Sequence, residues 1–139
     1  VVRQTPAEGG APAPFVLTLD SLRFRGSFLS LVIPLPEAEA TALTSRDVLQ
    51  LDLTASMTAQ TKLYGRLNLG QGPNDAQMLA EFPSSHDEGG MTVAFDLAYA
   101  NLRDSPVERA WIDLIVERPA MLRLTLHDLI LSRRPRAEL

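Results

Sequence analysis

Short segments in which apolar and polar residues alternate with a period of two recur along this 139-residue chain and favour a fold built from strands. The clearest segment is residues 48–57, whose apolar side is Leu49, Leu51, Leu53, Ala55 and Met57. Successive side chains of a strand point to opposite faces, so this pattern is typical of a half-buried strand in an antiparallel sheet. Helical spacing is rare by comparison.

The same pattern predicts strands in six further segments: residues 15–24, 27–35, 62–69, 91–99, 109–117 and 121–133. Residues 70–74, with the sequence GQGPN, are a strong turn signal. Residues 36–43 favour a short helix behind Pro36, and residues 75–82 are expected to form one or two helical turns. We therefore predict an all-β chain, an antiparallel two-sheet β-sandwich of the jelly-roll kind, with about seven or eight strands and one or two short helices.

The first and last predicted strands share an irregularity. Their sequences LTLDSL and LTLHDL both carry a polar pair, Asp20-Ser21 and His127-Asp128, beyond which the apolar residues change parity. A bulge or a bend at each pair would restore a single buried face. We expect these two strands to lie side by side.

The apolar faces of the predicted strands define one core. We expect it to contain Leu49, Leu51, Leu53, Leu63, Leu67, Val93, Phe95, Leu97, Ile112, Leu114 and Leu124.

Length and composition suit one domain. Residues 1–14 are rich in Pro, Gly and Ala without periodicity, so we expect a linker or leader there and a single β-sandwich domain over residues 15–139. The sequence begins at Val1 and not at Met, so we expect a longer parent protein, and the compartment stays open.

Composition also argues against several functions. The chain has no Cys, which excludes disulfides, thiolate metal sites and a cysteine nucleophile. Its net charge is −4 and its basic residues are scattered, which does not suggest a nucleic-acid surface. No apolar run approaches the ~20 residues of a membrane span. No nucleophile elbow or P-loop occurs, so we do not expect an enzyme.

The two histidines offer little metal chemistry. His86 is expected in a solvated loop, and His127-Asp128 at the parity change is expected at a sheet rim or bonded to local backbone. The alternative is a structural calcium ion bound by Asp128 and backbone carbonyls, since calcium prefers oxygen ligands. No other cofactor is expected.

The polar face of residues 62–69 carries Tyr64, Arg66 and Asn68 beside Lys62. An aromatic ring with guanidinium and amide groups suits a sugar, which offers C–H faces for stacking and paired hydroxyls for hydrogen bonds. The alternative is an ordinary solvent face. Trp111 faces away from the predicted core, either as an exposed platform or covered by a loop or the short helix in a strand that is buried on both sides. It contributes to the site only if its strand lies in the same sheet.

Residues 26–139 resemble an uncharacterised family of alphaproteobacterial proteins with a domain of unknown function. The segments that carry the resemblance are GSFLSLVIPLP, RLNLGQGPN, FDLAY, WIDLIVE and SRRPRAEL. The resemblance implies a preceding N-terminal region and a β-sandwich similar to carbohydrate-binding modules. It implies no activity or site.

The sequence thus favours a non-catalytic binding module for a glycan, through Tyr64, Arg66, Asn68 and Trp111. The alternative is a protein-protein interaction or assembly module that uses the same residues. A glycan hydrolase is least favoured, because the seventeen acidic residues single out no catalytic pair.

Overall fold

The computed structural model describes residues 2–6, 15–21, 28–58, 61–83, 89–117 and 122–137. These residues form nine strands, one short α-helix and one 3-10 turn. The elements are β1 (Val2–Pro6), β2 (Phe15–Ser21), β3 (Phe28–Pro34), α1 (Glu37–Thr41), β4 (Asp47–Met57), β5 (Leu63–Gln71), β6 (Asn74–Glu81), β7 (Gly89–Asp96), η1 (Leu97–Tyr99), β8 (Arg109–Glu117) and β9 (Leu122–Pro135).

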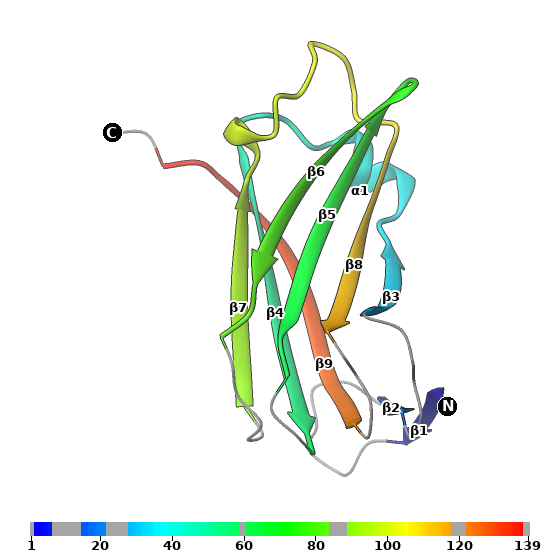
Figure 1. Ribbon diagram of the computed structural model, residues 1–139. Helices are drawn as coiled ribbons and strands as arrows, with labels where there is room; N and C mark the ends of the chain where they lie inside the picture. Colours follow the sequence, from blue (N-terminus) through cyan, green and yellow to red (C-terminus); the bar gives the residue numbers. More distant parts are fainter. Residues whose placement is uncertain are drawn as a thin grey trace.

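The strands form two antiparallel sheets that pack face to face (Figure 1). The five-stranded sheet has the order β1-β2-β9-β4-β7, and the four-stranded sheet has the order β3-β8-β5-β6. From β2 onward the chain crosses between the sheets in the pattern of a jelly roll, with β1 added at the edge beside β2. The predicted fold class is confirmed.

Among the described residues, one apolar core fills the space between the sheets. All eleven predicted core residues are buried and belong to the same cluster, and Leu51, Leu67, Ile112 and Leu114 have no exposed surface. The core follows from the period of two, because the inner residues of β4, β5, β7 and β8 come from alternate positions.

The parity change in the last strand is a β-bulge. In the pairing of β4 with β9, Thr54 lies opposite Asp128 and Ala55 lies opposite Leu126, so His127 is the extra residue. The bulge lets Leu126 and Leu129 both pack against the core. As predicted, β2 and β9 are neighbours; they pair regularly through Asp20 and Ser21, where β2 ends, and the predicted strand residues 22–24 lie outside the described residues.

One predicted element was wrong, and the end of another was misplaced. The expected helical turns at residues 75–82 are β6, which pairs with β5 through a tight turn at Gly72 and Pro73. Gly72 has a φ of +62°, which glycine adopts without strain. The expected strand at residues 91–99 ends at Asp96, whose side chain accepts a hydrogen bond from Ala98 N and starts η1.

The helix expected at residues 36–43 is α1. Part of the expected linker, Val2–Pro6, forms β1, and residues 7–14 lie outside the described residues. The division into a leader and one domain stays a prediction. None of the described helices is long and apolar enough to span a membrane.

Candidate functional site

The outer face of the four-stranded sheet brings together most of the predicted site. Strands β5 and β8 are neighbours, with Tyr64 opposite Ile115, Arg66 opposite Asp113 and Asn68 opposite Trp111. All of these positions alternate with core residues, so their side chains share the outer face. The condition set for Trp111, a strand in the same sheet, is therefore met.

A hollow of about 700 Å³ lies on this outer face. We call it the Tyr64 hollow; its lining residues are Phe28, Ser30, Tyr64, Arg66, Gln77, Leu79, Ile115 and Glu117. They come from all four strands of the sheet. Ile115 is buried but lies outside the core cluster, so it forms an apolar floor.

Apolar and polar groups share the rim of the Tyr64 hollow. Phe28 is 55% exposed and Leu79 is 64% exposed, while Tyr64 is half-buried. Arg66, Gln77 and Glu117 add a guanidinium, an amide and a carboxylate. The hollow therefore offers aromatic and aliphatic contact area beside hydrogen-bond donors and acceptors.

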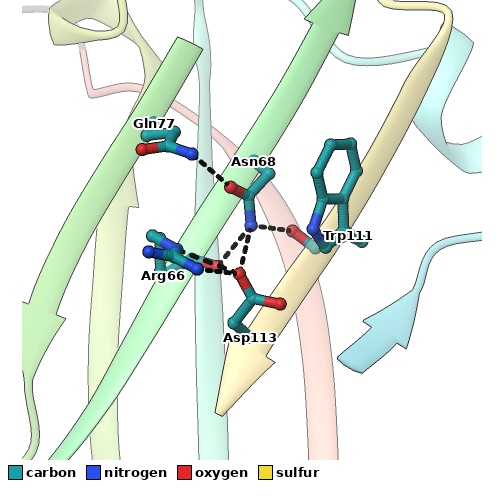
Figure 2. Close-up of polar contacts among 5 residues, drawn as sticks. All are labelled: Arg66, Asn68, Gln77, Trp111 and Asp113. Atoms are coloured by element: carbon teal, nitrogen blue, oxygen red, sulfur yellow. Dashed lines mark hydrogen bonds and ion pairs between the residues drawn. The ribbon is translucent and has the colours of Figure 1, made fainter. Parts of the chain in front are cut away.

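A polar network holds Arg66 in place (Figure 2). Its Nε and Nη2 donate to Oδ2 of Asp113 at 2.9 and 2.7 Å. Asp113 is 4% exposed, and Asn68 Nδ2 donates to the same oxygen at 3.0 Å. A buried charge requires such partners, because its desolvation is otherwise uncompensated. The network therefore orients the Arg66 guanidinium while 38% of its side chain stays exposed.

Asn68 points to the outer face of the sheet but is buried there. It is 1% exposed, and its amide nitrogen also donates to the backbone oxygens of Arg66 and Trp111. Its amide oxygen accepts a hydrogen bond from Gln77 at 3.1 Å (Figure 2). The nitrogen and the oxygen of the Asn68 side-chain amide thus both have hydrogen-bond partners within the protein.

Trp111 is half-buried and lines a second hollow, of about 500 Å³, farther along the same sheet. The two hollows share no lining residue. The structure therefore places Tyr64 and Arg66 together, Asn68 buried on the same face and Trp111 beside them.

Asp128, the predicted calcium ligand, lies on β9 opposite Thr54 and next to the bulge at His127. His127 Nε2 is 3.2 Å from Ser56 Oγ. Within the part of the chain that the structure describes, no three His, Asp or Glu side chains form a group that could hold a metal ion. The calcium site stays a prediction, and His86 lies outside the described residues.

Sequence reasoning missed the residues that β3 and β6 add to the Tyr64 hollow. Phe28 and Ser30 alternate with Leu29 and Leu31, so their outward direction was visible in the sequence. Gln77 and Leu79 were hidden by the mistaken helix at residues 75–82. Glu117, at the end of β8, alternates with the core residues Leu114 and Val116, so its outward direction was visible too.

Residues 1–139 match a family of unknown function, DUF6478. The chain belongs to this family. No curated protein matches the sequence. This assignment confirms the resemblance to an uncharacterised family with a domain of unknown function, and the structural neighbours include carbohydrate-binding modules.

Three solved structures illustrate the fold. The enzymatically active domain of tailspike protein 4 from bacteriophage CBA120 has a TM-score of 0.61 at 13% identity, over 96% of this chain and 19% of that one. The Family 16 Carbohydrate Binding Module-2 has a TM-score of 0.51 at 13% identity, over 94% of this chain and 84% of the module. The structure of the CBM22-1 and GH10 modules of Clostridium thermocellum xylanase 10B, complexed with xylohexaose, has a TM-score of 0.53 at 5% identity. The match covers 99% of this chain and 25% of that one.

The chain thus spans about a fifth of the tailspike chain and a quarter of the xylanase chain. At these identities the likeness is one of fold.

Proposed function

We propose that this chain is a non-catalytic module that binds a glycan in the Tyr64 hollow. The observation that carries the proposal is the composition of the hollow, an aromatic ring and a fixed guanidinium above an apolar floor. Sites for small polar ligands combine apolar walls with a few placed polar groups in this way. The fold shared with a carbohydrate-binding module supports the same function.

Each rim residue has a defined role in this proposal. Tyr64 and Phe28 stack against the C–H faces of sugar rings, because aromatic rings offer flat apolar surface. Arg66 donates to hydroxyl oxygens through Nη1, since its Nε and Nη2 are engaged by Asp113. Gln77 and Glu117 accept from hydroxyl groups. Asn68 acts as a positioning residue, and Trp111 contributes where a longer ligand reaches its hollow.

A second candidate function is a protein-protein interaction module. Phe28, Val32 and Leu79 are 55%, 63% and 64% exposed on the same sheet face, and exposed apolar groups of this kind also mark protein interfaces. A glycan ligand explains Arg66 and its buried support better, because that network costs desolvation that an apolar interface does not need.

The test is a glycan array followed by calorimetry with the glycans retained. Tyr64→Ala should lose glycan binding while its melting temperature stays near that of the parent, because the ring is half-buried and outside the core cluster. Tyr99→Ala is the matched control, since Tyr99 is the other tyrosine and is 71% exposed outside the Tyr64 hollow.

Retention of no glycan by the parent, or equal binding by parent and Tyr64→Ala, would refute glycan binding at this hollow. A Tyr64→Ala chain that loses stability together with binding would assign Tyr64 a structural role.

A further inference from the structure

A third hollow, of about 840 Å³, lies on the outer face of the other sheet. We call it the Arg134 hollow; its lining residues are Ser45, Arg46, Val48, Ala94, Asp96, Arg134, Arg136 and Ala137. It lies where β4 begins and where β7 and β9 end. It is thus on the opposite outer face of the sandwich from the Tyr64 hollow.

Strand register gathers the three arginines of this hollow. Val48 lies opposite Arg134 on β9 and opposite Asp96 on β7, so these residues form one row across three strands. Beyond the end of β9, Arg136 N donates to the backbone oxygen of Arg46 at 2.6 Å. The arginines are therefore brought together by the sheet, although Arg46 is distant in sequence from the others.

One arginine is neutralised and the other two are not. Arg136 Nε donates to Asp96 Oδ2 at 2.9 Å, and its guanidinium lies 5.6 Å from the centre of the Tyr99 ring. Over the described ranges, the guanidinium groups of Arg46 and Arg134 make no ion pair and no hydrogen bond, and the hydrogen bonds of Arg46 are made by its backbone. Three guanidinium groups and one carboxylate leave two positive charges in excess in a chain whose net charge is −4.

The electrostatics of Asp96 agree with this arrangement. Desolvation alone would raise the pKa of Asp96, but the hydrogen bonds from Ala98 and Arg136 and the nearby charges of Arg136 and Arg134 outweigh it and lower the pKa. The guanidinium of Arg134 therefore lies close enough to act on a carboxylate in this hollow.

The floor of the hollow is apolar. Val48 points to the outer face, lies outside the core cluster and is still only 6% exposed, so its neighbours on this face cover it. Long arginine side chains cover apolar surface with their methylene groups and keep the charged end in water. Charges above such a floor are screened less than charges that are fully surrounded by solvent.

We propose that the Arg134 hollow binds a phosphate group. Arginine matches phosphate because its planar fork donates paired hydrogen bonds to oxyanions. A phosphomonoester carries about −1.5 to −2 charges at pH 7, which matches the excess of two positive charges. The group can be inorganic phosphate or the phosphate of a sugar phosphate. This site is independent of glycan binding in the Tyr64 hollow.

The experiment titrates the full chain with inorganic phosphate and, separately, with glucose 6-phosphate in buffer containing chloride at physiological ionic strength. Amide chemical shifts should saturate and move at Val48, Ala94 and Asp96. The double variant Arg46→Gln with Arg134→Gln should lose about tenfold or more of the affinity. Arg103→Gln is the matched control, because Arg103 is exposed on a loop outside this hollow.

If the two ligands bind with equal affinity, the phosphate group alone is recognised. If glucose 6-phosphate binds more tightly, the sugar also contacts the protein. Both results support the site. Tyr64→Ala should bind phosphate as the parent does, which separates this proposal from glycan binding. Shifts that do not saturate with either ligand, or a double variant that keeps the parent affinity, would overturn it.

Discussion

Replacing Asn68 by Leu tests whether the buried network under the Tyr64 hollow stabilises the fold. The amide nitrogen of Asn68 lies 3.0 Å from Asp113 Oδ2, and its oxygen accepts from Gln77 at 3.1 Å. A hydrogen bond to a charged group contributes about 1.5–3 kcal/mol, and the remaining bonds are neutral ones of about 0.5–1.5 kcal/mol each. Burial of the added apolar surface of Leu offsets part of this loss.

We therefore expect Asn68→Leu to lower the free energy of unfolding by about 2–3 kcal/mol. A chain of this size should then unfold about 8–12 °C lower, at about 4 °C per kcal/mol. Urea denaturation would measure the first quantity and circular dichroism melting the second.

Gln77→Leu is the graded control for the same network. Gln77 is exposed and gives Asn68 a single neutral hydrogen bond, so its loss should cost only about 0.5–1 kcal/mol. If Asn68→Leu were as stable as the parent, the network would not contribute to folding, and the burial of Asp113 would need another explanation.

Two further predictions concern glycine and pH. A Cβ on Gly65 would meet Phe82 and Phe95 at 3.5 Å, an ordinary contact, so Gly65→Ala should stabilise the chain by about 0.5–1 kcal/mol. Gly72 has a φ of +62°, so Gly72→Ala should destabilise the chain by about 1–2 kcal/mol. Urea denaturation measures both changes. The lowered pKa of Asp96 means that its stabilising effect is complete above the unfolded value of about 3.9 and is lost as the pH falls through the folded value. Asp96→Asn should therefore melt below the parent at pH 7 and approach it as the pH falls toward about 2; a constant difference would contradict the assignment.

Much of the fold was predictable because the period of two is a local property. Strands β4, β5, β7 and β8, which supply most of the core, could be recognised from their own residues, and the parity change at His127 located a bulge that tertiary pairing confirms. The segment at residues 75–82 failed because Ala, Met, Leu and Glu favour helices, while its pairing with β5 across the turn decided for a strand.

The candidate site was predictable only in part. Alternation places Tyr64, Arg66 and Asn68 on one face, but it does not show which neighbours cover that face. Asn68 is buried because β8 puts Trp111 opposite it and β6 puts Gln77 on its other side. These neighbours come from distant parts of the chain.

By itself the sequence determined most of the strands and the predicted residues that point inward, since side-chain alternation needs no knowledge of neighbours. The matched polar pairs of the first and last predicted strands also indicated that these two strands are neighbours. The tertiary structure alone decided the order of strands in each sheet. That order separates Tyr64 and Arg66 in a hollow from the buried Asn68, and it brings Arg46 beside Arg134 and Arg136. Hollows and charge clusters form between strands far apart in sequence, so their positions depend on long-range pairing.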